Sequence, residues 1–156
     1  MTTAPCHITA SEYSRLLFSI FWSDNWFWFV LPVVLFAALG MLDWRYFVVA
    51  LMALLVVIPM VMALVYFYYM LTVETRWSIV EKTVTASNDG LLLDFGPGKT
   101  ALVGWKMVSG VYAKGSYVLV QLNVRRYQYL VLPRGAFAGL DDIHSFARVV
   151  TGNLNR

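Results

Sequence analysis

Charge and cysteine are both scarce in this chain, and each shortage narrows what the protein is. Charged residues make up 13% of its 156 residues, about half the share that is usual in soluble domains, whereas 60% are hydrophobic. This composition favours membrane insertion over a soluble globular fold. The one cysteine, Cys6, excludes an internal disulfide framework and a cysteine-rich metal site. We interpret it as a free thiol without a functional role.

The sequence also lacks the residue patterns of enzymes and cofactor sites. Gly98-Lys99-Thr100 resembles the end of a phosphate-binding loop, but Leu93 occupies the place of its first glycine. His7 and His144 have no ligand spacing around them, and Asp141-Asp142 is more typical of helix capping than of metal binding. We therefore predict no enzyme activity, no catalytic or metal-ligating residue and no cofactor. A net charge of +3 is too small to indicate nucleic-acid binding.

What the sequence does contain is two long apolar runs, residues 26–42 and 46–73, with no charged side chain or histidine in either. A helix needs about 20 residues to cross the hydrocarbon core of a bilayer, with about 17 as the lower limit. Asp43, Trp44 and Arg45 separate the runs, and we predict that they form the turn of a transmembrane helical hairpin with spans at about 26–42 and 46–70. The alternative, one helix through both runs, would bury a charged pair in lipid at high cost.

The segment before the first run has helical features of its own. Thr9 and Glu12 have the spacing of a capping box, and apolar residues follow at helical spacing from Tyr13 to Phe21. We interpret residues 1–25 as an amphipathic, interfacial segment that carries a short helix. The alternative left open is that this helix continues into the first span as one bent helix.

Residues 74–156 consist of short apolar or alternating stretches separated by turn signals. Asn88-Asp89-Gly90 and Gly96-Pro97-Gly98 are typical of tight turns, and Arg125-Arg126 indicates another. RWSIVEKTVTA is predicted to be a strand leaving the membrane, and GLDDIHSFARVV an amphipathic helix with Leu140 on its apolar face. The predicted fold is thus an α+β membrane protein, whose residues 74–156 form about six strands in a curved antiparallel sheet closed by a C-terminal helix.

The orientation follows from the distribution of basic residues. Residues 74–156 contain ten Lys or Arg and six Asp or Glu, whereas the hairpin turn has one charge of each sign. Arg76 and Lys82 lie near the end of the second run, and Arg15 precedes the first. The positive-inside rule therefore predicts that both termini are cytoplasmic.

Two apolar spans followed by this strand pattern resemble the YcxB-like family, whose C-terminal domain is similar to a bacterial pleckstrin-homology (PH) fold. The likeness is carried by three stretches: ITASEY near the start, Gly104-Trp105, and VLPRGAF before the final helix. The family's tryptophan, proline, basic residue and phenylalanine correspond to Trp105, Pro133, Arg134 and Phe137. Gly135 and Ala136 before Phe137 are a minor departure. The resemblance implies a PH-like domain at residues 74–156, no catalytic residues, and a location in a bacterial inner membrane. Trp105, Pro133 and Phe137 would be packing residues.

Several basic residues of the second half fall in predicted turns or at strand ends: Lys99, Lys106, Lys114, Arg125, Arg126 and Arg134. They are candidate contacts for anionic lipid or for a partner; the alternative is dispersed, solvated charge. We expect a non-enzymatic, membrane-anchored interaction module, whose partners are membrane lipids and either another protein or a second copy, but no nucleic acid. Two other hypotheses stay open: a subunit of an oligomeric transport or pore assembly, and an immunity or defence component.

Overall fold

The computed structural model describes residues 2–154, and the chain divides into two compact units. Ser14–Met70 contains the two long apolar helices and is called the helical hairpin below. Met1–Tyr13 and Leu71–Arg156 together make the other unit, which contains every strand among the described residues and is called the sheet unit. The fold class is α+β, as predicted, with the N-terminal residues belonging to the same unit as the sheets.

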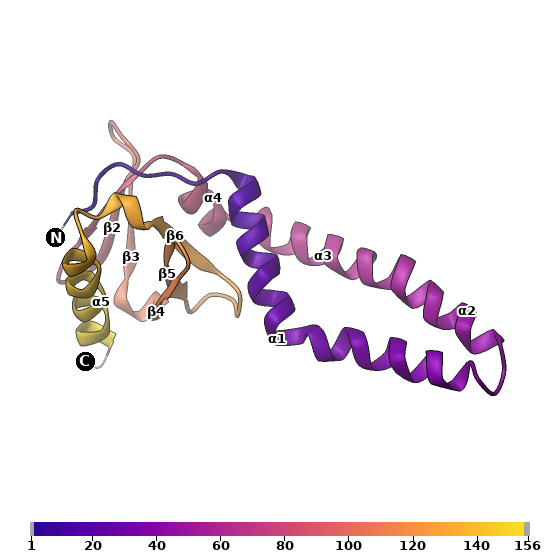
Figure 1. Cartoon of the computed structure of the whole chain (residues 1–156). Helices are drawn as coiled ribbons and strands as arrows, with labels where there is room; N and C mark the ends of the chain where they lie inside the picture. The colour runs from indigo at the N-terminus through magenta and orange to yellow at the C-terminus, as the bar shows by residue number, and fades with distance from the viewer. Residues whose placement is uncertain (1, 155–156) are drawn as a thin grey trace. The chain divides into compact units, whose positions relative to one another are not determined.

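The first helix, α1, runs from Ala10 to Leu39 without interruption. The predicted capping box is present: Glu12 N–H donates to Thr9 Oγ1 (3.2 Å), and the Glu12 carboxylate accepts the Thr9 N–H (2.8 Å). The predicted separate interfacial helix is therefore wrong, because the amphipathic start and the first apolar run form a single helix. α1 bends part-way along its length (Figure 1), which is the alternative that the sequence left open.

A tight turn joins the two apolar helices where the charges of the sequence indicated it. The turn begins at Gly40 rather than at Asp43, and Arg45 is already the first residue of α2 (Arg45–Met52). Asp43 Oδ1 accepts the Arg45 N–H at 3.0 Å and so satisfies a backbone donor at the start of that helix. A Cβ on Gly40 would lie 2.6 Å from the Phe47 ring, so glycine permits the close approach of the two arms.

The second apolar helix continues from α2 through a π-helical segment, η1 (Ala53–Val57), into α3 (Ile58–Met70). Pro59 lies in the first turn of α3. A proline has no N–H, and its ring clashes with the carbonyl group four residues earlier, so the wider π turn accommodates it. α1 and the second helix run side by side in opposite directions (Figure 1), and the rings of Phe18 and Tyr66 stack 6.3 Å apart.

Residues 73–79 form a helix, α4 (Val73–Ile79), and not the strand predicted for RWSIVEKTVTA. Only the last four residues of that stretch are a strand, β1 (Thr83–Ala86). Thr72 is the reason for the helix start, since its side chain accepts the N–H of Thr75 as an N-cap. Thr75 and Ser78 then recur at helical spacing on the buried face.

Residues 2–154 contain six strands, the number predicted, but they form two antiparallel sheets instead of one curved sheet. The first has the order β1-β2-β3 and the second β4-β5-β6. The remaining elements of this unit are β2 (Gly90–Asp94), β3 (Thr100–Gly104), the 3-10 turn η2 (Trp105–Met107), β4 (Val108–Lys114), β5 (Tyr117–Leu122), β6 (Tyr129–Pro133), the 3-10 turn η3 (Arg134–Ala136) and α5 (Leu140–Leu154). The predicted turn signals join β1 to β2, β2 to β3, and β5 to β6.

One hydrophobic core lies between the two sheets and α5. The sheets contribute alternate residues of their strands, among them Val84, Leu91, Leu93, Val103, Val118, Val120, Leu130 and Leu132. α5 contributes Phe146 and Val150, both fully buried, and it contacts β1, η2 and β4, so it spans the two sheets. Leu140, predicted on the same buried face, is 64% exposed at the start of the helix.

Candidate functional site

A row of buried polar side chains follows directly after the helical hairpin, on α4 and just beyond it. Thr72, Thr75, Ser78 and Lys82 are all buried, and they recur every three or four residues. Buried polar groups destabilise a fold unless they are hydrogen-bonded. Their partners therefore define how α4 is attached to the rest of the sheet unit.

A chain of hydrogen bonds, called the polar chain below, connects three distant parts of the sequence. Gln128 Nε2 donates to Thr72 Oγ1 (2.5 Å), and Thr72 Oγ1 donates to Thr75 Oγ1 (3.0 Å). Thr75 Oγ1 donates to the Tyr13 hydroxyl (3.3 Å), which donates to the carbonyl oxygen of Tyr129 (3.4 Å). Each hydroxyl both accepts and donates, so the polar chain runs in one direction from the amide of Gln128 to a backbone carbonyl of β6. It fastens the first turn of α1 and the start of α4 to the same strand.

Ser78 and Gln128 add further contacts at this place. Ser78 Oγ donates to the carbonyl oxygen of Tyr129 (3.1 Å) and accepts the N–H of Val131 (3.1 Å), so the last turn of α4 is bonded directly to β6. Gln128 Nε2 also donates to the Glu74 carboxylate (3.1 Å). Within the described residues, Gln128 Oε1 is a buried acceptor without a hydrogen-bond partner. The side-chain amide of Gln128 thus bonds to Thr72 and Glu74, the residues that follow the hairpin, through its nitrogen alone.

The N-terminal segment, residues 2–6, lies along the outer edge of β1. Cys6 and Lys82 exchange two backbone hydrogen bonds (2.8 and 3.0 Å), and the Thr3 N–H donates to the carbonyl of Val84 (2.9 Å). The Ala4 N–H donates to a carbonyl of η3 (2.9 Å). The segment therefore covers a strand edge that would otherwise present unpaired backbone groups.

Lys82 lies at the centre of this attachment and is only 1% exposed. Its Nζ donates to the carbonyl oxygen of Ser78 (2.9 Å). Burial lowers the pKa of Lys82 to about 8, against a nearby Cys6 that acts in the opposite direction. Burial in turn raises the pKa of the Cys6 thiol, which keeps that sulfur protonated and weakly nucleophilic.

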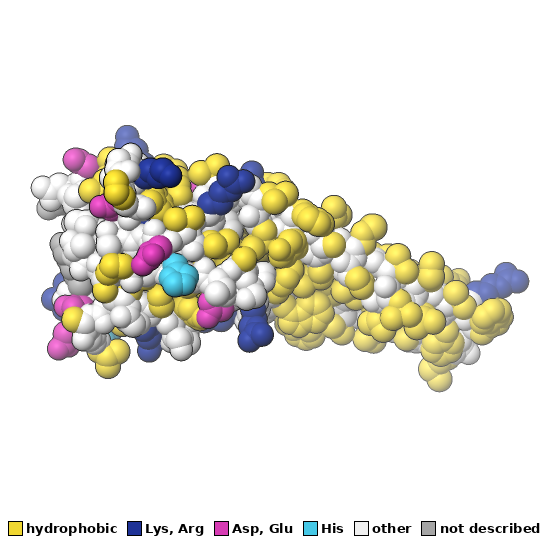
Figure 2. Space-filling model, turned by 90° about the horizontal axis from the view of Figure 1, so that it is seen from above, with side chains coloured by type: hydrophobic (Ala, Val, Ile, Leu, Met, Phe, Trp, Pro, Cys, Tyr) yellow, Lys and Arg dark blue, Asp and Glu magenta, His cyan; other side chains and the backbone are white. Residues whose placement is uncertain are grey.

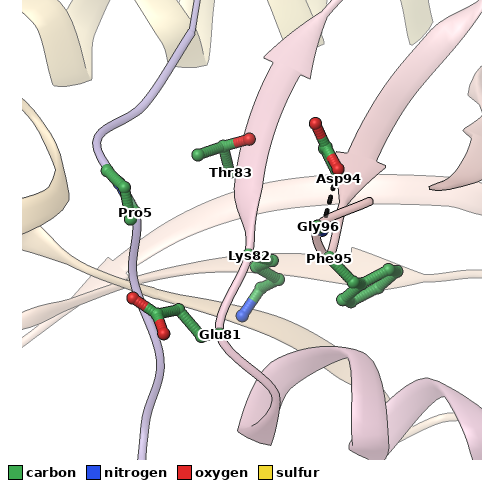
Figure 3. Close-up of a pocket in the computed structure, with 7 residues that line it drawn as sticks. All are labelled: Pro5, Glu81, Lys82, Thr83, Asp94, Phe95 and Gly96. Atoms are coloured by element: carbon green, nitrogen blue, oxygen red, sulfur yellow. Dashed lines mark hydrogen bonds between the residues drawn. The ribbon is translucent and has the colours of Figure 1, made fainter. Parts of the chain in front are cut away.

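A shallow cleft of about 270 Å³ opens beside Lys82. Figure 3 shows its lining, in which Pro5 comes from the N-terminal segment, Glu81 and Thr83 flank Lys82, and Asp94 to Gly96 come from the end of β2. Asp94 Oδ1 accepts the Gly96 N–H (2.9 Å) and is thereby occupied in shaping its turn. An amine and two carboxylates give this cleft no net preference for an anion. Among residues 2–154, no three His, Cys, Asp or Glu side chains lie close enough together to hold a metal ion.

The predicted basic contacts do not form one patch. Arg125 and Arg126 lie in the β5–β6 turn, immediately before Gln128 of the polar chain. Lys114 ends β4, and Arg134 in η3 lies beside the next turn, because its N–H donates to the carbonyl of Ser116 (2.9 Å). The two others are separate: Lys99 lies in the β2–β3 turn and Lys106 in η2.

The residues that carry the family resemblance make packing contacts. Trp105 Nε1 donates to the carbonyl oxygen of Asn88 (2.9 Å), which ties η2 to the β1–β2 turn. Phe137 is buried, and its ring centroid lies 5.4 Å from that of Phe146 on α5. Pro133 is the last residue of β6.

The polar chain was missed in the sequence. Thr72, Thr75 and Ser78 form a three-residue polar repeat that fits one face of a short helix, and this signal would have identified α4. Nothing in the sequence pairs that repeat with Tyr13 or Gln128, which are brought to it by the tertiary fold.

Comparison of the chain with protein-family models, with curated proteins and with solved structures finds no match. The resemblance to the YcxB-like family therefore stays a prediction based on the short stretches quoted above.

Proposed function

We propose that the protein is a membrane-anchored, non-enzymatic interaction module, in which the helical hairpin lies in the bilayer and the sheet unit is displayed at the membrane surface. The observation that carries this proposal is the exposure of the two apolar helices. No residue of the most apolar 18-residue window of α1 is buried, and only 6% of the corresponding window of Arg45–Met70. The helical core of a soluble protein would show the opposite, so these side chains need lipid around them.

The pattern of side chains on the helical hairpin supports the same proposal. Figure 2 shows hydrophobic side chains over almost the whole visible face of the long helices, with Lys or Arg at the hairpin end. From Asp24 to Leu39, α1 rises about 22 Å, and the second apolar helix, Arg45–Met70, rises about 38 Å, so the two lengths bracket the thickness of about 30 Å of a hydrocarbon core. Aromatic rings gather at the end near Asp24, including the stacked pair Trp22 and Phe29 (5.6 Å), as is typical of a membrane interface.

The sheet unit offers a surface for a partner protein. Leu92 and Leu102 are directly opposite each other on β2 and β3, and they are 38% and 53% exposed. The two leucines form a small apolar surface, which a bound partner would remove from water. As finer parts of the proposal, we infer that the sheet unit is cytoplasmic and PH-like and that the chain is a member of the YcxB-like family. The excess of basic residues after the second apolar helix supports the orientation.

The anchoring is tested by alkaline carbonate extraction of membranes from cells that express the full-length chain, followed by thiol mapping. Two single-cysteine variants are made in a Cys6→Ser background: Met41→Cys in the hairpin turn and Leu140→Cys in the sheet unit, both at exposed positions. An impermeant maleimide should label the first in intact cells and the second only after permeabilisation. Release by carbonate refutes anchoring, equal labelling refutes the hairpin, and a reversed pattern refutes only the orientation.

The interaction surface is tested by placing a photo-crosslinking residue at Leu102 in the membrane-embedded chain. A discrete cross-linked product is expected, and a substitution of Leu92 by serine should reduce its yield. Crosslinks to the chain itself alone would replace the partner protein by self-association, and the absence of any product would refute a contact surface on this sheet.

A further inference from the structure

The sheet unit has a second open cleft, with a volume of about 440 Å³, which the proposed function does not use. Three stretches of chain line it: residues 7, 8 and 12 around the start of α1, residues 115–117 in and after the β4–β5 turn, and residues 133–135 at the end of β6 and in η3. All of them belong to the sheet unit. The volume lies within the range of about 300–1,000 Å³ that is usual for small-molecule sites, so the lining side chains decide what the cleft can bind.

Glu12 provides a fixed negative charge in this cleft. Its Oε2 accepts the N–H and the hydroxyl of Thr9 (both 2.8 Å), and its Oε1 accepts the Tyr117 hydroxyl (3.3 Å). These bonds, that of the Thr9 N–H first among them, lower the pKa of Glu12, so the group is ionised at neutral pH. A carboxylate has about four acceptor positions, and Oε1 therefore retains one for a further donor.

Arg134 provides the opposite charge and is free to bind a ligand. Its backbone is held in place, since its N–H donates to the carbonyl of Ser116 (2.9 Å) and its carbonyl accepts the N–H of Phe137 (3.1 Å). The side chains of Arg134, Ser116 and His7 are exposed, and none has a hydrogen bond or an ion pair within residues 2–154. A guanidinium, a hydroxyl and an imidazole are therefore available as donors to an anionic group.

The charged side chains of the lining favour a ligand that carries both signs of charge. Besides His7, they are Glu12 and Arg134. Glu12 would repel a simple anion, and Arg134 would repel a simple cation. A zwitterion, in contrast, meets an attractive partner at each of its ends. Pro133 and Tyr117 are both half-buried and offer apolar surface to the carbon atoms between those ends.

We propose that this cleft binds a small zwitterion in which a primary ammonium is joined to a carboxylate or a phosphate. The ammonium donates to Glu12 Oε1, and the anionic group binds the Arg134 guanidinium, with Ser116 and His7 as further donors. A free amino acid and the headgroup of phosphatidylethanolamine share this chemistry, and the test distinguishes the two sources. Binding at this cleft does not depend on the anchoring proposed above, so either proposal can fail alone.

The test is isothermal titration calorimetry of the full-length chain in dodecyl maltoside micelles. Two zwitterions are titrated, L-leucine for the amino acids and glycerophosphoethanolamine for the lipid headgroup. N-acetyl-leucine lacks the ammonium and leucinamide lacks the carboxylate, so each should bind at least about tenfold more weakly than leucine, having lost one charge-assisted bond. Binding of glycerophosphoethanolamine alone would assign the cleft to a lipid headgroup. Binding of neither zwitterion, or a half-probe that binds as tightly as leucine, overturns the inference.

Two charge variants test the assigned partners. Glu12→Gln keeps the capping box, because glutamine can replace glutamate at that position, and Arg134→Gln removes the guanidinium. Each should weaken binding of the zwitterion about tenfold, and Glu12→Gln should not weaken binding of N-acetyl-leucine, which has no ammonium. The matched control is Lys99→Gln, which removes one charge from the exposed β2–β3 turn. An equal loss in this control would overturn the assignment.

A steric variant tests the location without changing any charge. A Cβ on Gly135 would meet no atom within 4 Å, and its φ is not positive, so Gly135→Leu adds a side chain to the lining without backbone strain. It should weaken binding at least about tenfold, whereas Gly152→Leu, at an exposed position on α5 with the same freedom, should leave it unchanged. The buried Cys6 thiol should stay protected from maleimide in every variant that is folded. Unchanged binding in a folded Gly135→Leu protein would overturn the site.

Discussion

Replacing Lys82 by methionine removes an ammonium group from the interior of the sheet unit and keeps an unbranched side chain of similar length. Lys82 is 1% exposed, and its Nζ has the carbonyl of Ser78 as acceptor. Because burial lowers its pKa from 10.5 to about 8, the charged form destabilises the folded state at neutral pH. We expect Lys82→Met to be more stable than the parent protein at pH 7.

The magnitude follows from the shift in pKa. Each unit corresponds to about 1.4 kcal/mol, so the charged form of Lys82 costs about 3 kcal/mol in the folded state. Below pH 8 the lysine is protonated in both folded and unfolded states, and this cost is present in full. As the pH rises from about 8 towards 10.5, the unfolded state binds more protons than the folded state, so the free energy of unfolding increases. Between pH 7 and pH 9, the free energy of unfolding of the parent protein should therefore increase by about 1.4 kcal/mol relative to that of the Lys82→Met variant.

The accessibility of the Cys6 thiol reports on this stability. Cys6 is the single cysteine of the chain, is buried, and is hydrogen-bonded to Lys82 through its backbone. Its rate of maleimide labelling in the full-length protein in micelles, divided by the rate in the denatured chain at the same pH, gives the free energy of opening of the N-terminal segment. The ratio of protection between parent and variant should change about tenfold from pH 7 to pH 9. The thiol reacts in the open form, where it is exposed, so the raised pKa that burial gives Cys6 in the folded form does not enter this ratio.

A variant that is less protected than the parent at pH 7 would refute this account, since it would mean that the ammonium group stabilises the fold. A ratio that does not change with pH would show that Lys82 titrates near its ordinary value. Lys106→Met is the matched control, because Lys106 is exposed on η2. It should leave both the protection of Cys6 and its pH dependence within about 0.5 kcal/mol of the parent.

Three more substitutions, and one control substitution, test the packing of the sheet unit by the same thiol protection or by thermal unfolding. Phe146→Ala removes the fully buried ring of α5 and should cost about 3–5 kcal/mol; a cost below 1 kcal/mol would contradict the core described here. Thr75→Val keeps the shape but interrupts the polar chain, which should cost about 1–3 kcal/mol because buried partners lose their bonds; an unchanged stability would show that the polar chain is dispensable. Gly90→Ala would place a Cβ against the backbone carbonyl of Val103 and should cost about 2–3 kcal/mol, whereas Gly104→Ala on the facing strand meets only an ordinary contact and should be mild.

The local signals of the sequence were good predictors of the strands and turns. Asn88-Asp89-Gly90 and Gly96-Pro97-Gly98 do join strands, and the Thr9 capping box does begin α1. These features depend on a few neighbouring residues, so the sequence contains all the information they need. The charges at Asp43 and Arg45 likewise located the hairpin turn to within a few residues.

The features that failed depend on contacts between distant residues. Residues 76–80, Arg-Trp-Ser-Ile-Val, have the β-branched and aromatic composition of a strand, and only the cap at Thr72 and the buried contacts of Thr75 with Tyr13 make the segment helical. The division into two sheets is decided by which strands pair, and alternation within a strand does not determine its partner. The burial of Lys82, against the usual exposure of lysine, was equally invisible in the sequence.

The sheet unit is built from two separate stretches of chain, with the whole hairpin inserted between Tyr13 and Leu71. If the hairpin lies in a bilayer, the sheet unit can form only when both of these stretches are on the same side of the membrane. A chain that crossed the membrane only once would leave residues 2–13 on the opposite side, with the edge of β1 uncovered and the Thr75 hydroxyl separated from Tyr13. If the helical hairpin spans a bilayer, as proposed above, only the doubly crossed form can complete the sheet unit.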